Sequence, residues 1–296
     1  MPSLRDLAEL VRAPAALSVP GDVVAGAAAA DALDRRVPGL AGASVLLYWA
    51  GMAANDWADR ELDARERPER PIPSGRVSPG LALGVSAGLT AAGIGLAGLA
   101  GGRRALAVAV PLAGTIWAYD LRAKNTPAGP AVMAACRGLD VLLGASQGRP
   151  LRAVPAALTV AAHTYTVTEL SRREVSGATR TLPVATLAGT AAVAAAAVAP
   201  RRDGASAGEP GRRVTWRSLV PAALAGWYGL QYGGAQARVA ADPQASRVRA
   251  AVGTGITGLP ALQGALVARA GAALLGVAVA AAAPLGRRLA RLVSPT

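Results

Sequence analysis

The chain has 296 residues, of which 52% are hydrophobic and only 17% are charged, and its mean hydropathy is +0.35. A soluble domain usually has about a quarter charged residues, and here the apolar residues come in runs long enough to cross a bilayer as helices. We therefore expect an all-α polytopic membrane protein. The net charge of +13 does not predict a nucleic-acid partner, because the arginines form small clusters between apolar runs, as in loops that flank membrane helices. We expect acidic membrane lipids to be the partner of these clusters.

The chain opens with "MPSLRDLAELVRAP", which predicts a short amphipathic helix on the membrane surface and not a cleavable signal peptide. Nine apolar segments follow, and we expect nine transmembrane helices bundled around a central cavity, in a single domain over residues 1–296. The segments are about 14–32, 37–55, 80–101, 104–121, 128–147, 152–171, 181–200, 215–236 and 258–286. The single cysteine, Cys136, lies in the fifth segment and is predicted to be a small buried residue.

The second apolar segment ends in a dense block of acidic residues. Asp56, Asp59 and Asp63 follow the spacing i, i+3, i+7, which places three carboxylates on one face of a helix, and Asn55 can join that face. Like charges repel one another unless a cation lies among them, and Mg²⁺ binds hard oxygen ligands while keeping substrate phosphates in its shell. The alternative is a solvated helix end whose acids pair with the neighbouring arginines, Arg60, Arg67 and Arg70.

The stretch "NDWADRELD", residues 55–63, followed by "RPERPIPSG", residues 67–75, resembles the first signature of the UbiA-type intramembrane prenyltransferases. The resemblance extends over the chain, with nine spans and charged loops after the second, fourth and sixth. It implies that an isoprenyl diphosphate binds through Mg²⁺ held by the three aspartates, and that the prenyl group passes to a lipophilic or small-molecule acceptor within the membrane. Arg67 and Arg70 would then contact the remaining phosphate oxygens, since arginine suits bidentate contact.

A second segment, "WAYDLRAKNTPAG" at residues 117–129, resembles the family's charged stretch before the fifth span. By this resemblance Lys124 and Arg122 would hold the diphosphate. Tyr119 and Asp120 would line the pocket or cap the helix. The alternative is an ordinary pair of basic residues beside the membrane.

A third segment, "TELSRREVSGATRTLPV" at residues 168–184, departs from the family. It keeps the glycine and the Thr-Leu-Pro ending, but where many relatives have a second aspartate cluster it has Glu169, Arg173 and Glu174. Two interpretations are open. Either Glu169, or as second choice Glu174, holds a second Mg²⁺, or the arginines neutralise the diphosphate directly.

Charged residues inside apolar segments usually face an interior cavity and pair with one another. Arg137 and Asp140 are three positions apart in the fifth segment and could form such a pair, either in a substrate site or in a structural role. Asp22 in the first segment is predicted to lie on the acceptor side. His163, the only histidine, is predicted to be a packed residue and not a catalyst.

The resemblance implies a Mg²⁺-dependent prenyltransferase whose acceptor is a quinone precursor, a tetrapyrrole, a glycerol phosphate or a polyol. The alternatives are phosphoribosyl transfer to a lipid phosphate and a non-enzymatic lipid-diphosphate carrier or transporter. A transporter should show inverted repeats, and none is found in the sequence.

The arginine- and alanine-rich composition is typical of a GC-rich bacterial genome. We expect a protein of the cytoplasmic membrane with its active-site face in the cytoplasm, because isoprenyl diphosphates are made there. The basic residues divide almost evenly between the two faces and give no orientation.

Overall fold

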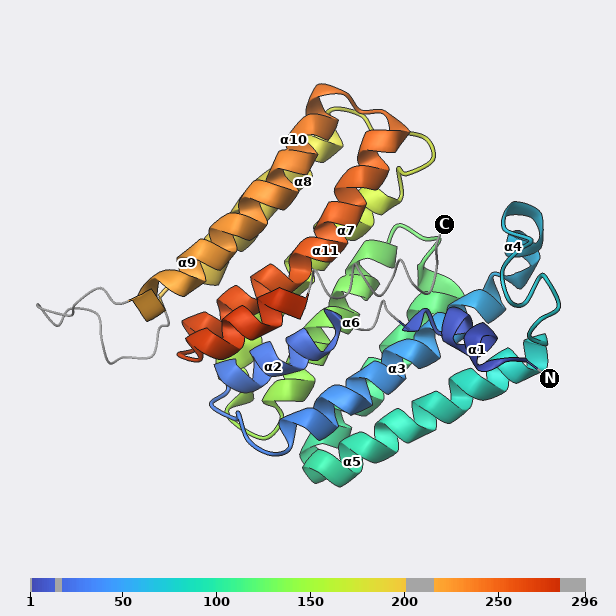
Figure 1. Cartoon of the computed structure of the whole chain (residues 1–296), viewed down its shortest axis with the longest axis horizontal. Helices are drawn as coiled ribbons and strands as arrows, with labels where there is room; N and C mark the ends of the chain where they lie inside the picture. The colour runs from blue at the N-terminus through green and yellow to red at the C-terminus, as the bar shows by residue number, and fades with distance from the viewer. Residues whose placement is uncertain (1, 14–17, 201–215, 283–296) are drawn as a thin grey trace, which may run out of the picture. The chain divides into compact units, whose positions relative to one another are not determined.

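The structure is a computed structural model that describes residues 2–13, 18–200 and 216–282, and every regular element in these ranges is a helix (Figure 1). The all-α prediction is therefore confirmed. The chain divides into two compact units, of which the first includes Met1–Tyr165 and the second is Thr166–Ala283. We describe each unit by itself, and the single-domain organisation stays a prediction.

The first unit contains a short N-terminal helix and a set of longer apolar ones. Prolines stand in the first turns of α2, α3, α5 and α6, where their missing N–H leaves no hydrogen bond unmade, and Ser78 caps α5 by accepting from the Leu81 amide. The elements are α1 (Leu4–Leu10), α2 (Pro20–Ala29), α3 (Val37–Ala58), α4 (Arg60–Glu66), α5 (Pro79–Ala118), the π-helical turn η2 (Tyr119–Ala123), α6 (Gly129–Ala145) and the first part of α7 (Pro150–Ser171).

Helix α5 is a helical hairpin and not one straight rod. Gly102 has φ 61° and ψ −152°, a backbone conformation that ends the first leg and that glycine adopts without strain. The Trp117 indole N–H donates to the Thr90 hydroxyl over 3.0 Å, although 27 residues of continuous helix would separate them by about 40 Å. The two legs therefore run back alongside each other, as the predicted segments 80–101 and 104–121 require.

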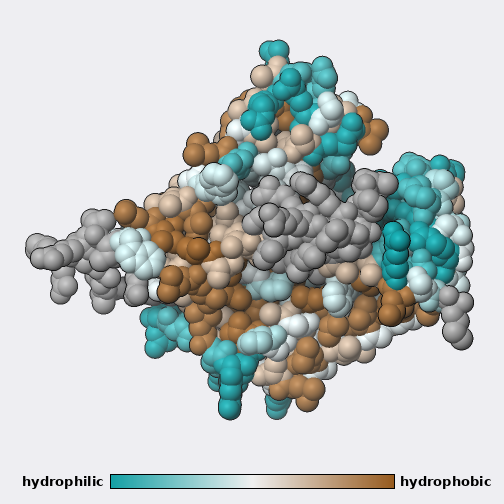
Figure 2. All heavy atoms as spheres, viewed as in Figure 1, coloured by the Kyte–Doolittle hydropathy of each residue, from teal (hydrophilic) through white to brown (hydrophobic). Residues whose placement is uncertain are grey.

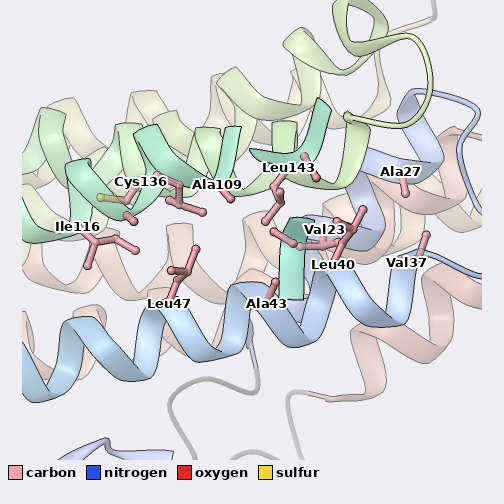
Figure 3. Packing of buried hydrophobic residues seen from close by; sticks show 14 residues of the cluster. Val23, Ala27, Val37, Leu40, Ala43, Leu47, Ala109, Ile116, Cys136 and Leu143 are labelled. Carbon is pink, nitrogen blue, oxygen red and sulfur yellow. The ribbon is translucent and has the colours of Figure 1, made fainter. Parts of the chain in front are cut away.

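Helices α2 and α6 approach so closely that their backbones touch. A Cβ at Gly144 would lie 1.9 Å from the carbonyl oxygen of Val23, and one at Gly26 would lie 1.7 Å from that of Val141. Glycine is thus required at both contacts. The core beside this contact combines residues of α2, α3, α5 and α6, with Leu40, Leu47, Ile116 and Leu143 as its larger members (Figure 3). Cys136 is buried in the same core and forms no disulfide, as predicted.

The second unit begins within α7 and is also helical. The Arg269 guanidinium donates to the Ala196 carbonyl oxygen over 2.6 Å and ties the end of α11 to α8. The elements that follow α7 are α8 (Thr181–Val198), α9 (Trp216–Tyr228), the π-helical turn η3 (Gly229–Gly233), α10 (Gly234–Ala241) and α11 (Ala245–Arg269).

Four helical stretches are long and apolar enough to cross a membrane, namely Val37–Ala58, Pro79–Ala123, Thr181–Val198 and Ala245–Arg269. Nine crossings are not confirmed. Helix α2 has 10 residues and α6 has 17, whereas a span needs about 20, and the α5 hairpin counts as one stretch. Leu81, Leu99 and Val110 of α5 are exposed apolar residues, as expected of a helix that faces lipid. Figure 2 shows this hydrophobic flank of α5, with hydrophilic residues gathered over α4.

Candidate functional site

The aspartate cluster, by which we mean Asp56, Asp59 and Asp63, lies where the apolar helix α3 passes into α4. The helix is interrupted at Asp59, which has φ −89° and ψ 2° and joins the two helices. The prediction of one continuous helical stripe is therefore wrong in this detail. Asp56 and Asp63 are nevertheless buried, with 4% and 1% of each residue exposed, so two carboxylates are held out of solvent at this helix junction.

Arginines from the following loop neutralise two of these carboxylates. Arg70 Nη1 lies 2.6 Å from Oδ2 of Asp63 and 3.3 Å from Oδ1 of Asp56, so one guanidinium bridges both acids. Arg67 Nη1 lies 3.5 Å from Oδ1 of Asp63. The arginine–acid pairing that the sequence left open as an alternative is thus present for Arg67 and Arg70, whereas Arg60 pairs with Glu61 at 3.3 Å.

The third aspartate, Asp59, pairs with Lys124, the residue that follows the η2 turn. Lys124 Nζ lies 2.6 Å from Oδ1 of Asp59 and donates over 3.0 Å to the side-chain oxygen of Asn55. The structure therefore brings Lys124 and Asn55 to the aspartate cluster, as the two motifs predict. Arg122 is exposed and Tyr119 half-buried, and within the described parts of the chain Arg122 forms no ion pair with these acids.

Arg12 is a site residue that sequence reasoning missed. Its Nη2 lies 2.7 Å from Oδ1 of Asp56, and its backbone has φ 45°, a left-handed conformation that costs free energy in a residue other than glycine. No local pattern predicts a contact between positions 44 apart in sequence. The signal that exists is the short amphipathic segment itself, which contains this arginine.

Helix α1 packs on the protein and holds Arg12 in place. Leu10 is fully buried in a small core with residues of α3 and α5. Arg76 Nη1 lies 2.8 Å from Asp6 and 2.7 Å from Glu9. Hydrogen bonds from Ser3 and Arg76 lower the pKa of Asp6 to about 2, and those from Arg76 lower the pKa of Glu9. The apolar face of α1 that we predicted for the membrane surface thus partly covers protein.

A buried ion pair lies deeper in the first unit, and it differs from the predicted one. Arg137 Nε lies 2.8 Å from Oδ2 of Asp22 in α2, and within the described residues no ion pair of 4.0 Å or less joins it to Asp140 of its own helix. Asp140 instead accepts a short hydrogen bond from Ser44. The glycine contact between α2 and α6 brings Asp22 within reach, so tertiary packing decides the partner. The buried His163 agrees with a packed role.

The third segment belongs to the second unit. Helix α7 ends at Ser171, so Glu169 lies in its last turn and is half-buried, whereas Glu174 lies in the loop beyond. Arg173 is exposed, and the Glu174 carbonyl oxygen accepts from Arg249 over 2.7 Å. Glu169 and Glu174 therefore do not share a helical face.

The aspartate cluster fits Mg²⁺ by ligand type, because carboxylate oxygens are the ligands that this ion prefers. Oδ1 of Asp63 is buried and accepts no hydrogen bond from any described residue. Residues 2–13, 18–200 and 216–282 contain no group of three or more His, Cys, Asp or Glu side chains arranged to hold a metal ion. The carboxylates of Asp56, Asp59 and Asp63 instead form ion pairs with arginine and lysine side chains. Metal binding here therefore requires the carboxylates to exchange these partners for the ion.

Comparison with known proteins identifies the family. The model of the UbiA prenyltransferase family matches residues 18–199, a range that includes the aspartate cluster, the η2 turn and the third segment. The chain belongs to the UbiA prenyltransferase family. Arg12 lies outside the matched range, in agreement with its absence from the motifs.

The relatives of this UbiA-family protein include several proteins named digeranylgeranylglyceryl phosphate synthase. The one from Methanopyrus kandleri is 42% identical over 106 residues, which cover 35% of this chain and 39% of that protein. The one from Natronomonas pharaonis is 34% identical over 194 residues, covering 62% and 70% respectively. The match thus spans 39% of the length of the Methanopyrus protein and 70% of the length of the Natronomonas protein. Both organisms are archaea, so these relatives do not support the bacterial origin that composition predicts.

Two solved structures share the fold. One, reported under the name digeranylgeranylglyceryl phosphate synthase, has a TM-score of 0.66 at 16% identity and covers 90% of this chain and 98% of its own. The other, a UbiA homologue from Aeropyrum pernix K1 without ligand, has a TM-score of 0.64 at 18% identity, covering 86% and 96%. At these identities the likeness establishes the fold.

Proposed function

We propose that this protein transfers a prenyl group from an isoprenyl diphosphate to a glycerophosphate acceptor within the membrane. The observation that carries the proposal is the aspartate cluster at the end of an apolar helix, with each carboxylate held by a basic side chain. A diphosphate with a prenyl tail needs this combination of a charged site and an adjoining apolar helix.

The basic side chains have two roles in this proposal. Without substrate, Arg12, Arg70 and Lys124 neutralise carboxylates that would otherwise repel one another. Asp56, Asp59 and Asp63 would hold Mg²⁺, which would supply charge neutralisation that makes diphosphate a better leaving group. The guanidinium and ammonium groups would then be available to the remaining phosphate oxygens, which suit bidentate contact with arginine. Arg67 is the further candidate for this contact.

The acceptor follows from the relatives. The product in their name carries two geranylgeranyl groups on a glyceryl phosphate, so prenyl transfer to make it takes geranylgeranyl diphosphate and geranylgeranylglyceryl phosphate.

The test is product formation by purified protein in lipid nanodiscs with these two substrates, the donor radiolabelled, and Mg²⁺. Wild type and Glu66→Gln, which alters an exposed carboxylate of α4, should form labelled product. Asp59→Asn should reduce the rate by orders of magnitude. Binding of the donor without any transfer, in wild type, would favour the lipid-diphosphate carrier instead.

We further propose that the face carrying α4 is cytoplasmic, because isoprenyl diphosphates are made in the cytosol. A cysteine introduced by Glu66→Cys should resist membrane-impermeant thiol reagents on intact cells and react after lysis. The native Cys136 is 1% exposed and contributes little background. Labelling from outside would reverse the proposed orientation.

A further inference from the structure

Three loops at one end of the first unit carry six arginines and only two acidic residues. The loops are 30–36 between α2 and α3, 101–104 at the turn of the α5 hairpin, and 146–152 from the end of α6 into α7. Their arginines, which we call the arginine patch, are Arg35, Arg36, Arg103, Arg104, Arg149 and Arg152, and their acids are Asp31 and Asp34. The three loops together therefore have an excess of four positive charges.

Direct contacts bring these loops together. The Gln147 side-chain amide donates to the Gly101 carbonyl oxygen over 2.9 Å and accepts from the Arg36 guanidinium over 3.2 Å. A Cβ at Gly101 would lie 2.5 Å from the Gln147 amide nitrogen, so a larger residue there would displace this side chain. The Arg149 amide donates to the Ala30 carbonyl oxygen over 3.0 Å. Figure 1 shows the α5 turn and the loop between α2 and α3 at the same end of the first unit. The arginines of three loops thus share one surface.

Half of the arginine patch has no carboxylate partner. Arg152 pairs with Asp31 over 2.6 Å. Arg35, Arg103 and Arg104 are exposed, and none of them forms an ion pair or a side-chain hydrogen bond with any residue that the structure describes. In the aspartate cluster, by contrast, each carboxylate already has a basic partner. The positive charge left for an external anion therefore lies at the arginine patch.

The arginine patch lies where a spanning helix meets the lipid headgroups. Arg36 directly precedes α3, which is long and apolar enough to cross a membrane, and basic residues beside such helices lie at the headgroup level. The 22 residues of α3 extend about 33 Å, so the patch and Asp56 lie at opposite ends of this helix. Leu151, within the third loop, is 84% exposed, and Leu99, at the end of the first leg of α5, is 88% exposed. These apolar side chains suit contact with acyl chains.

We propose that the arginine patch binds the headgroup phosphate of an anionic phospholipid. Arginine binds phosphate oxygens in bidentate fashion, and each basic residue near an anionic membrane surface raises the affinity about fivefold. The exposed leucines favour a lipid over a free anion. The expectation that acidic lipids meet every arginine cluster is thereby narrowed to one end of the first unit. The inference does not depend on the proposed reaction, because no residue of the aspartate cluster takes part.

The test is native mass spectrometry of the purified protein in detergent with equal amounts of phosphatidylglycerol and phosphatidylcholine. Wild type should retain phosphatidylglycerol in preference, and the triple variant Arg35→Gln, Arg103→Gln, Arg104→Gln should reduce this preference about tenfold or more. The matched control changes three exposed arginines of α1, α4 and η2 and so removes the same charge, as Arg5→Gln, Arg65→Gln, Arg122→Gln. The control should keep the preference. No preference in wild type, an unchanged preference in the first variant, or equal losses in both variants would overturn the inference.

A second measurement locates the lipid on the unmodified protein. Hydrogen exchange in phosphatidylglycerol nanodiscs, compared with phosphatidylcholine nanodiscs, should be slower for the amides of 30–36, 101–104 and 146–152 and unchanged for those of 60–70. Inorganic phosphate added to phosphatidylcholine nanodiscs should not reproduce this protection, since it has no acyl chains. The same protection from inorganic phosphate would show a site for a free anion, and protection confined to 60–70 would place the lipid elsewhere. Either result would contradict the inference.

Discussion

Arg12 and Arg70 share one carboxylate oxygen, because both guanidinium groups contact Oδ1 of Asp56, at 2.7 and 3.3 Å. The two arginines come from opposite sides of α3 in sequence, one from the segment before α2 and the other from the loop after α4. An oxygen that attracts two cations is a strong site for a metal ion. The same two cations compete with that ion until a diphosphate gives them another partner.

Arg12→Ala should therefore affect the two ligands in opposite directions. Mn²⁺ binding should become several-fold tighter, because a competing cation is removed from Asp56. Binding of inorganic diphosphate in the presence of Mn²⁺ should weaken about tenfold, the loss expected for one hydrogen bond to a charged group. Both can be measured by isothermal titration calorimetry, with Arg5→Ala on the exposed side of α1 as the control. Weaker Mn²⁺ binding in Arg12→Ala would contradict the competition.

The contact of α1 with Arg76 should depend on pH in the acid range. Asp6 and Glu9 have folded-state pKa values below their ordinary values of 3.8 and 4.5. Their contribution to stability is thus fully present above about pH 4.5 and is lost as the pH falls toward 2. Hydrogen exchange of the α1 amides should be slow at pH 7 and pH 5, after correction for intrinsic rates, and faster at pH 3.

In Arg76→Ala, hydrogen exchange of the α1 amides should be fast already at neutral pH. In the control Arg103→Ala, which changes an exposed residue at the turn of the α5 hairpin, this exchange should stay slow. Equal protection of α1 in wild type and Arg76→Ala would show that the buried Leu10, and not the ion pairs, holds this helix.

The sequence predicted the helices and the position of the aspartate cluster better than it predicted the contacts between helices. Runs of apolar residues and the motif are local patterns, so the hairpin break near Gly102 and the cluster at the end of α3 were both predictable. The pairing of Arg137 was not, because the i, i+3 spacing within α6 favoured Asp140. Glycines allow α2 to pack against α6 and bring Asp22 closer, which is a tertiary effect.

The contact of α2 with α6 gives a stability prediction. Gly144→Ala should lower the melting temperature strongly, because its methyl group would lie 1.9 Å from the Val23 carbonyl oxygen and force the helices apart. Overpacking of this kind typically costs about 1–3 kcal/mol. Gly95→Ala in α5 meets no atom within 4 Å and should leave stability unchanged or raise it by up to about 1 kcal/mol. Equal melting temperatures for the two variants would contradict the close packing.

The two interpretations of the third segment can be separated by Mg²⁺ dependence. If Glu169 is a metal ligand, Glu169→Gln should raise the Mg²⁺ concentration needed for half-maximal activity, since an amide oxygen is a poorer ligand than a carboxylate. If Arg173 neutralises diphosphate, Arg173→Ala should raise the KM for the donor and leave the Mg²⁺ dependence unchanged. We expect the first result. No change in either variant would assign this loop a structural role only.

Arg12 shows where sequence reasoning ends. The motif named the three aspartates and Lys124, but nothing in the local pattern placed Arg12 on Asp56.

The central claim is that the aspartate cluster exchanges its basic partners for a metal ion that binds diphosphate. Anomalous scattering from crystals of the protein with Mn²⁺ and geranylgeranyl diphosphate tests it most directly. We predict a Mn²⁺ peak within bonding distance of carboxylates of Asp56, Asp59 and Asp63, with Arg12 and Lys124 moved from those carboxylates to phosphate oxygens. A metal bound elsewhere, with the pairs of Arg12 with Asp56 and of Lys124 with Asp59 unchanged, would contradict the account.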